Sequence, residues 1–120
     1  MSDLRASIES VWERRSSIDA SDLDALGSVV RAIDLIDRGE VRVAEPAADG
    51  GAPMVNEWLK HAILLFFQLS AIDTVELGPF EYADKVPLKR DFESSGVRAV
   101  PGAIVRWGAH LAPGVVLMPS

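Results

Sequence analysis

The stretch that decides the fold is Glu57-Trp58-Leu59-Lys60-His61-Ala62-Ile63-Leu64-Leu65-Phe66-Phe67, in the middle of the 120-residue chain. It contains neither proline nor glycine, and after His61 it is apolar on every face of a helix. Asn56 stands where the N-cap of such a helix is expected. A helix apolar on all faces is buried, so we expect this one to lie at the centre of the core.

Two amphipathic segments precede this helix. The first repeats its apolar residues along one helical face, at Leu4, Ile8, Val11 and Trp12. The second has an apolar stripe at Leu23, Leu26, Val30, Ile33 and Ile36. Ser2 or Asp3 is the expected N-cap of the first helix, residues 21–24 begin the second in the manner of a capping box, and Gly39 ends it.

Strand patterns surround and follow the long helix. Residues 41–45 alternate between apolar and polar types, residues 46–53 are rich in turn formers, and residues 54–55 can return as the second strand of a hairpin. After Ser70, the prolines at positions 79, 87 and 101 and several β-branched or aromatic residues favour short strands over helices. The predicted fold class is therefore α+β, a small helical domain with a hairpin and short strands.

The last eighteen residues have a different period. Val105, Leu111 and Leu117 recur at intervals of six, and Ala109 and Val115 do so in another phase. A six-residue period is typical of a parallel β-helix, in which each hexapeptide forms one side of a triangular coil. Three hexapeptides counted from residue 103 complete one coil. We therefore divide the chain into an N-terminal α+β domain, residues 1–102, and a first hexapeptide coil, residues 103–120.

The composition is that of a globular domain, with 48% hydrophobic and 25% charged residues. The net charge of −6 argues against a nucleic-acid partner, because binding nucleic acid needs concentrated basic residues. The charge is uneven: residues 1–84 have a balance of −9 and residues 85–120 a balance of +3. The cationic stretch is suited to a small anionic ligand, or it is a solvated surface with uneven charge.

Several function classes find no support in the residues. There is no cysteine, and only two histidines, His61 and His110, so we expect no metal site. The longest apolar run, residues 62–67, falls short of the roughly 20 residues that span a bilayer. The N-terminus has acidic residues where a signal peptide needs basic ones. We expect a soluble, cytoplasmic protein with no membrane contact.

No catalytic motif emerges from the sequence. It contains no glycine-rich phosphate loop and no nucleophile elbow. We interpret His61 as a histidine of the core or its boundary. The carboxylate pairs Asp22/Asp24 and Asp34/Asp37 are interpreted as parts of solvated helix faces. The residues by themselves therefore predict no catalytic group within this chain.

Five ordered strings nevertheless resemble a known family. They are Arg42-Val43-Ala44-Glu45, the long helix quoted above, Tyr82-Ala83-Asp84-Lys85-Val86-Pro87-Leu88-Lys89, Gly96-Val97-Arg98-Ala99-Val100-Pro101-Gly102-Ala103-Ile104-Val105-Arg106, and Val116-Leu117-Met118-Pro119-Ser120. Together with Glu13-Arg14-Arg15 at the end of the first helix, they resemble the N-terminal part of the tetrahydrodipicolinate N-succinyltransferases. These are the acyltransferases of bacterial diaminopimelate and lysine synthesis.

The resemblance implies an architecture and a reaction. In the family, a small N-terminal domain leads into a left-handed β-helix, so residues 103–120 look like its first coil. Family members are homotrimers in which succinyl-CoA, the co-substrate, lies between neighbouring β-helices, and the substrate amine attacks the thioester. The acidic catalytic residues and the CoA groove belong to later coils. We therefore expect no catalytic residue and no bound cofactor in this chain, and no activity from it alone.

One site residue carries over from the family. Arg98, in the string Gly96-Val97-Arg98, matches the family's substrate-binding arginine just before the β-helix. A planar guanidinium can hold a carboxylate through two parallel hydrogen bonds, and the family's substrate is a dicarboxylate. Without the resemblance, Arg98 would be interpreted as an exposed arginine on a strand edge.

Two other interpretations remain open. The chain is alternatively a stand-alone binding or assembly module that associates with a complete trimeric enzyme and has no activity of its own. It is otherwise a generic α+β scaffold whose similarity arose by chance. The reading frame downstream of residue 120 distinguishes the first interpretation from the module, because further hexapeptides in frame indicate an enzyme.

Overall fold

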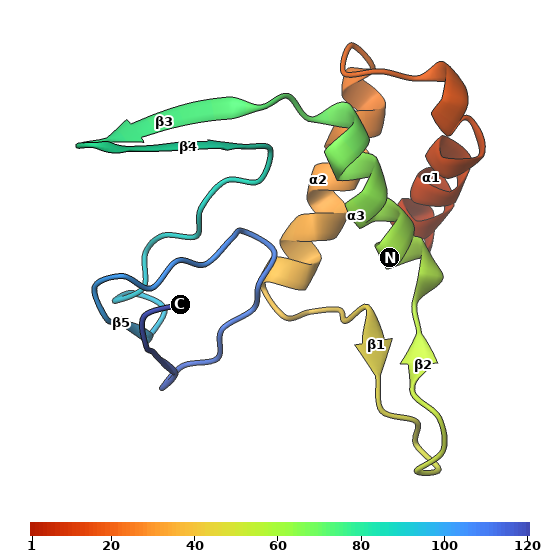
Figure 1. The fold of residues 1–120 in the computed structure, drawn as a ribbon. Helices are drawn as coiled ribbons and strands as arrows, with labels where there is room; N and C mark the ends of the chain where they lie inside the picture. The colour runs from red at the N-terminus through yellow and green to blue at the C-terminus, as the bar shows by residue number, and fades with distance from the viewer.

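The computed structural model describes residues 1–120 and contains three packed helices from which two hairpins and a loop of chain extend (Figure 1). The helices are α1 (Ser2–Glu13), α2 (Leu23–Asp37) and α3 (Glu57–Leu69), and a short 3-10 helix, η1 (Arg15–Ser17), follows α1. No helix follows residue 69, which confirms the prediction of extended structure there.

The strands form three separate two-stranded sheets. Strand β1 (Ala44–Glu45) pairs antiparallel with β2 (Met54–Val55), β3 (Asp73–Leu77) pairs antiparallel with β4 (Phe80–Asp84), and β5 (Arg98–Ala99) pairs parallel with β6 (Val116–Leu117). Both predicted hairpin strands and the short strands after α3 are present, so the α+β class is confirmed. The predicted strand at 41–45 is shorter than expected, because only its last two residues pair.

The three helices bury one apolar core. α3 contributes six of its residues, and Leu59, Ala62 and Leu65 on it are fully inaccessible to solvent. The prediction that this helix is central is confirmed. The prediction that it is buried on every face is wrong, because Leu64 is 48% exposed and Phe67 38% exposed.

The buried face of α2 differs from the predicted stripe. The residues that α2 buries are Ala25, Val29, Ala32 and Ile33. Leu23 is 74% exposed, while Leu26, Val30 and Ile36 lie at the flanks of the core. The small alanines explain the difference, because they let helices approach closely, and a pattern built on large residues alone misplaces the buried face. Gly39 ends the helix as predicted, with a φ of +74°.

The predicted helix caps have mixed outcomes. Asp22 is the N-cap of α2, and its Oδ1 accepts a hydrogen bond from the Ala25 N–H at 3.0 Å, as residues 21–24 predicted. The α1 prediction is wrong, since Met1 is the N-cap and no side chain caps the helix. Asn56 is the N-cap residue of α3, but its Nδ2 donates to the Arg42 carbonyl at 2.6 Å, which ties the β1–β2 hairpin to the helix.

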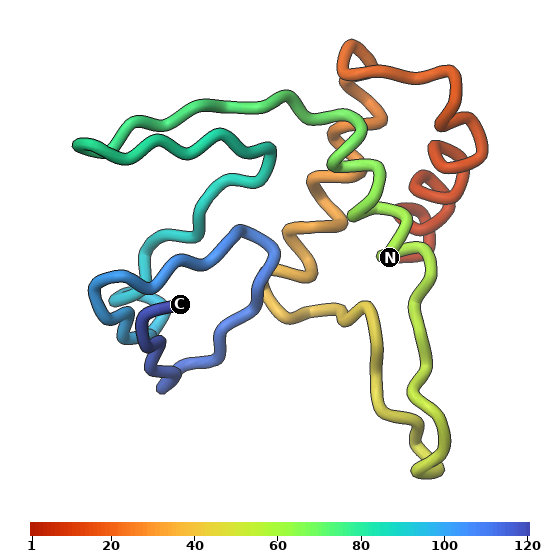
Figure 2. Tube along the Cα trace, viewed as in Figure 1, coloured from red at the N-terminus to blue at the C-terminus, as the bar shows by residue number.

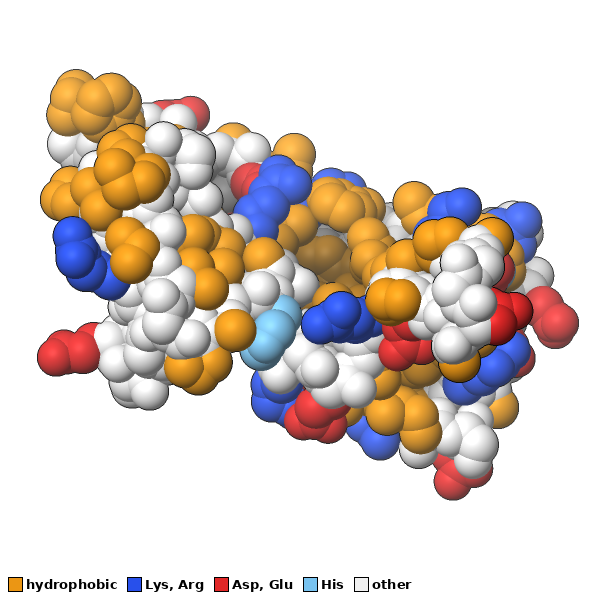
Figure 3. Space-filling view, turned by 90° about the horizontal axis from the view of Figure 1, so that it is seen from below, with side chains coloured by type: hydrophobic (Ala, Val, Ile, Leu, Met, Phe, Trp, Pro, Cys, Tyr) orange, Lys and Arg blue, Asp and Glu red, His pale blue; other side chains and the backbone are white.

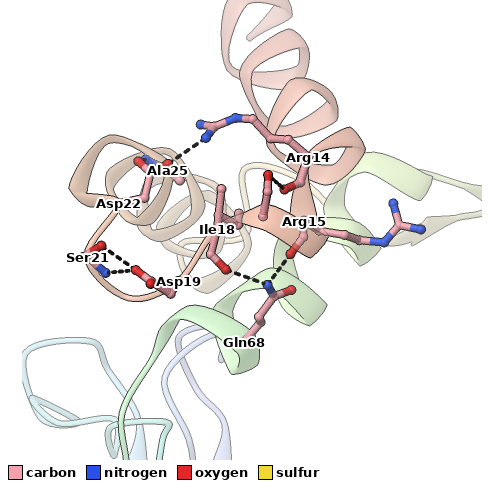
Figure 4. A network of polar contacts seen from close by, with 9 residues as sticks. Arg14, Arg15, Ile18, Asp19, Ser21, Asp22, Ala25 and Gln68 are labelled. Carbon is pink, nitrogen blue, oxygen red and sulfur yellow. Dashed lines mark hydrogen bonds and ion pairs between the residues drawn. The ribbon is translucent and has the colours of Figure 1, made fainter.

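Polar contacts hold the α1–α2 connection in place (Figure 4). Arg14 Nη1 donates to Asp22 Oδ2 at 2.7 Å, which joins the end of α1 to the start of α2. From α3, Gln68 Nε2 donates to the carbonyls of Arg15 at 2.6 Å and Ile18 at 3.3 Å. One amide group thus fixes a loop from a helix that is about fifty residues away in sequence.

The C-terminal part makes one loop and returns beside itself (Figure 2). Arg98 pairs with Val116 and Ala99 with Leu117, 18 positions apart, which equals three hexapeptides. The N–H of Arg98 donates to Val115 O, and the N–H of Val100 to Leu117 O, both at 3.0 Å. We call residues 98–117 the C-terminal loop.

Aliphatic residues and glycines repeat every six residues in and beside the C-terminal loop. Val105, Leu111 and Leu117 are all half-buried. Glycines with positive φ recur at the same interval, at Gly96, Gly102, Gly108 and Gly114. The hexapeptides 103–108 and 109–114 therefore each repeat an aliphatic residue and a glycine bend, whereas residues 115–120 repeat only the aliphatic residue.

None of the three helices has the length and apolar character needed to cross a membrane.

We predict that Leu65→Ala destabilises the protein by about 2–5 kcal/mol, because it opens a cavity in the core. Leu64→Ala, at the adjacent exposed position, should cost less than about 1 kcal/mol. Urea unfolding followed by circular dichroism measures both variants. Equal losses would show that α3 is not packed in the orientation described.

A second prediction concerns acid unfolding. The pKa of Asp22 lies below its ordinary value of 3.8, first because the Ala25 N–H donates to the carboxylate and then because Arg14 does. A lowered pKa stabilises the fold fully above pH 3.8, and this contribution is lost as the pH falls through the lowered pKa.

Asp22→Asn keeps a capping oxygen but does not titrate. Its melting temperature should therefore fall less than that of the wild type between about pH 4 and pH 2. Asp24→Asn, which removes a charge from the same helical turn, serves as the control. A wild-type acid response in Asp22→Asn would remove Asp22 from the acid transition.

Candidate functional site

Arg98 is exposed on strand β5 and its side chain has no partner in the chain. Its backbone is held by the parallel pairing with β6, while its guanidinium makes no hydrogen bond or ion pair. The neighbouring Ala99 faces inward and is half-buried, as alternation along a strand requires. Arg98 is thus a guanidinium on a fixed backbone that is free to bind an external carboxylate.

An open groove of about 400 Å³ lies near the C-terminal loop, between it and the β3–β4 hairpin. We call it the hairpin groove. Val75 and Tyr82 line it from the hairpin, and Leu88 and Ile104 line it from the other side. Its charged lining residues are Asp73, Asp84, Lys85 and Arg106. Arg98 does not line this groove, so the predicted substrate-binding arginine and the hairpin groove are separate features.

An ion pair crosses the rim of the hairpin groove. Arg106 Nη2 lies 2.7 Å from Asp84 Oδ2. The pKa of Asp84 is lowered, first because the backbone N–H of Lys85 donates to its carboxylate and then because Arg106 is close by. The contact links the C-terminal loop to the end of β4, and it neutralises one cation of the basic stretch.

Two further cations of the basic stretch, residues 85–120, also have partners within the chain. Lys89 Nζ lies 2.6 Å from Asp37 Oδ1, with both side chains largely buried, and Lys85 Nζ donates to the Phe67 carbonyl at 2.6 Å. Arg90 and Arg98 have no such partner. Paired cations attract external anions less than the net charge of +3 suggests. The positive charge that remains available to a ligand is confined to Arg90 and Arg98.

A cluster at the C-terminal end of α2 fixes the C-terminal loop. Asp37 Oδ1 accepts hydrogen bonds from Lys89 Nζ and from the Gly108 N–H, the latter at 2.8 Å. Asp34 Oδ1 accepts from Trp107 Nε1 at 2.9 Å. The prediction that Asp34 and Asp37 are a solvated surface pair is wrong, because both carboxylates bind the loop.

Close packing reinforces this cluster. The Trp107 ring meets the Phe66 ring at a centroid distance of 5.3 Å and an angle of 63°. His110 Nδ1 lies 3.1 Å from the carbonyl of Asp37, and a Cβ atom at Gly39 would lie 2.7 Å from the His110 ring. One feature of the sequence indicated that Asp37 faces the packed side of α2. Asp37 lies four residues after the buried Ile33 and so on the same helical face.

His61 lies at the core boundary, as predicted. Its ring stacks on Trp12 at a centroid distance of 4.0 Å with an interplanar angle of 5°. The guanidinium of Arg15 also lies over the Trp12 ring, at 4.2 Å. His61 therefore helps to join α3 to the end of α1. No cluster of three histidine, aspartate or glutamate side chains is arranged to hold a metal ion.

The structure is a small helical domain that supports the C-terminal loop, which is closed by parallel strand pairing. Within that loop, Arg98 is the arginine whose side chain has no partner. A model of the family described as tetrahydrodipicolinate N-succinyltransferase N-terminal matches residues 3–69, more than half of the chain. The chain belongs to this family of N-succinyltransferase N-terminal domains.

Curated relatives extend the similarity over almost the whole chain. These relatives are named 2,3,4,5-tetrahydropyridine-2,6-dicarboxylate N-succinyltransferase. The one from Methylorubrum extorquens (strain PA1) is 46% identical to this chain, over 98% of this chain and 45% of the relative. The one from Gluconobacter oxydans (strain 621H) is 48% identical, over 96% of this chain and 44% of the relative. The relative of that name in Aeromonas hydrophila subsp. hydrophila is 42% identical, over 100% of this chain and 46% of its own length. The chain thus spans a little under half the length of these relatives.

We predict that Asp37→Asn destabilises the protein by about 1–3 kcal/mol, since Lys89 then keeps no buried counter-charge. The Gly108 amide, which donates to this carboxylate, should exchange its hydrogen faster in the variant. Asp24→Asn, on the first turn of the same helix, is the control. Native-state hydrogen exchange read by NMR tests both, and unchanged protection at Gly108 would contradict the anchoring role.

Proposed function

We propose that this chain is the N-terminal portion of an acyltransferase of lysine and diaminopimelate biosynthesis. The reaction transfers a succinyl group from succinyl-CoA to the amino group derived from tetrahydrodipicolinate. Family membership and the names of the relatives support this proposal. In the reaction the amine nitrogen attacks the thioester carbonyl carbon, the carbon–sulfur bond breaks, CoA leaves as the thiol, and the amine loses a proton.

Arg98 is the substrate-binding residue in this proposal. The observation that carries it is the exposed guanidinium on β5, whose backbone is fixed by pairing with β6 and whose side chain has no partner. A dicarboxylate supplies the planar acceptor that such a guanidinium binds through two parallel hydrogen bonds. The pocket-forming groups that complete the site, and the catalytic groups, are proposed to come from outside residues 1–120.

The C-terminal residues are proposed to be the start of a left-handed parallel β-helix, with residues 103–120 as its first coil. Support comes from the 18-residue spacing of the parallel β5–β6 pairing and from the repeated glycine bends. In the same proposal the complete protein is a cytoplasmic homotrimer that binds succinyl-CoA with residues beyond this chain, and residues 1–120 alone have no activity.

A second candidate function is an assembly module without activity, which joins a complete trimeric enzyme. The observation that favours it is the β3–β4 hairpin, whose apolar residues stay exposed in the single chain. An activity measurement on a chimera distinguishes the two candidates. The chimera joins residues 1–120 to the part of the Methylorubrum extorquens relative that follows the matched region.

We predict that the chimera catalyses succinyl transfer and that the 120-residue chain does not. In the chimera, Arg98→Lys keeps the charge but loses the paired hydrogen bonds, so KM for the dicarboxylate should rise about tenfold or more. KM for succinyl-CoA should change less than about threefold. Arg31→Lys, at an exposed arginine of α2, is the control.

Steady-state kinetics with each substrate varied in turn measures these effects. Equal effects of Arg98→Lys on both substrates, or none, would remove Arg98 from the dicarboxylate site. A folded but inactive chimera, together with co-purification of the 120-residue chain with the complete relative, would favour the assembly module.

A further inference from the structure

Asp91 has an unusual backbone conformation close to the candidate site. Its φ is +62°, and it is the one residue other than glycine with a positive φ in the chain. The left-handed region is costly for a residue with a side chain, although aspartate and asparagine tolerate it better than most. Residues held in such a conformation cluster where function needs a particular geometry. Asp91 precedes the candidate substrate-binding residue, Arg98, by seven positions.

Hydrogen bonds hold Asp91 at the start of a closed turn, residues 91–97, which we call the entry turn. The carbonyl of Asp91 accepts hydrogen bonds from the Ser95 N–H at 3.1 Å and from the Ser94 and Ser95 hydroxyls at 3.0 and 2.9 Å. Three donors on one carbonyl fix the orientation of the peptide that joins Asp91 to Phe92. The first bend of the entry turn is therefore set by the backbone of Asp91.

Both ends of the entry turn are fixed to the C-terminal loop. Before the turn, the Lys89 N–H donates to the Val105 carbonyl at 2.8 Å. After the turn, the Arg98 N–H donates to the Val115 carbonyl at 3.0 Å. Val97, the last residue of the turn, is 6% exposed and is the one buried residue after α3. A change at the start of the turn is therefore passed on to the strand that carries Arg98.

The side chain of Asp91 does not explain why the residue is there. Asp91 is exposed, and its carboxylate makes no hydrogen bond or ion pair within the chain. The turn uses the backbone carbonyl of Asp91 together with its tolerance of the left-handed region. The contribution of this residue to the structure is thus conformational.

The exact position of Arg98 matters because it has little help from neighbouring charges. Hydrophobic and neutral side chains predominate, on the face shown in Figure 3, at the end of the molecule where Figure 1 places the C-terminal loop. Two parallel hydrogen bonds between a guanidinium and a carboxylate require the two groups to be aligned. A misplacement of about 1 Å in such a contact can lower a reaction rate by up to about 100-fold.

We propose that Asp91 is a positioning residue for Arg98, and that it acts through its left-handed backbone and not through its carboxylate. The conformation of Asp91 and its three hydrogen bonds set the entry turn, and the turn sets the direction in which β5 presents the guanidinium to a dicarboxylate. This inference rests on the substrate-binding role of Arg98 in the proposed function, and it adds a residue on which that role depends.

Substitutions in the chimera separate the backbone of Asp91 from its side chain. Asp91→Gly and Asp91→Asn accept the left-handed conformation, so KM for the dicarboxylate should change less than twofold. Asp91→Val resists this conformation, so that KM should rise at least fivefold while KM for succinyl-CoA changes less than twofold. The control is Glu93→Val, which removes the same charge from an exposed residue of the turn that has no positive φ. It should change neither KM more than twofold.

Amide hydrogen exchange of the 120-residue chain, measured by NMR, tests the positioning without the reaction. Asp91→Val should speed exchange at least fivefold at Val97, whose N–H donates to the Phe92 carbonyl, and at Arg98. Exchange at Leu65, in the buried face of α3, should change less than twofold. Asp91→Gly should leave all three amides within twofold of the wild type.

The outcomes distinguish this inference from the proposed reaction. Wild-type KM values in Asp91→Val, or an equal rise of both, would overturn the inference. Losses in Asp91→Gly and Asp91→Asn as large as in Asp91→Val would assign the role to the carboxylate and would also overturn it. An inactive wild-type chimera counts against the proposed reaction alone. Unchanged exchange at Arg98 in Asp91→Val, or equal acceleration at Leu65, would then still refute the positioning role.

Discussion

The arrangement of this molecule depends on the carboxylate of Asp37 at the end of α2. It accepts hydrogen bonds from Lys89 and from the backbone of Gly108, and these lie on two different segments that follow the helices. Without it, the helical core would have few polar ties to the last third of the chain. A partly buried carboxylate also needs such donors, because an unpaired charge in that position is costly. The donors of Lys89 and Gly108 therefore stabilise the carboxylate of α2, and the carboxylate in turn holds these two segments against the helix.

The same constraint sets the position of Arg98. The C-terminal loop is a closed path, since the β5–β6 pairing joins its beginning to its end. Anchoring the loop at Gly108, near its middle, therefore limits how far the strand that carries Arg98 can move. The helical domain thus affects the candidate ligand site by holding the C-terminal loop in position. None of its side chains makes a hydrogen bond or ion pair with Arg98.

The sequence predicted the elements well and their polar contacts poorly. The long apolar run of α3 and the breakers around it are local properties, so the helix, the hairpin and the absence of later helices followed from them. The role of Asp34 and Asp37 depends on Trp107 and Gly108, more than seventy residues away, and no local pattern encodes that pairing. Arg98 itself was found through a family resemblance, because an exposed arginine on a strand has no distinguishing pattern of its own.

The spacing of the loop explains why a weak period of aliphatic residues was meaningful. Gly96 has a φ of +71°, and a side chain there would come within 3.3 Å of Pro113. The N–H of Gly114 donates to the Gly96 carbonyl at 2.8 Å, so bends that are three hexapeptides apart lie against each other. A residue with a β-carbon at position 96 would strain the backbone and separate these bends. The glycine period is thus the stricter requirement, and it fixes the register that turns Arg98 outward and Ala99 inward.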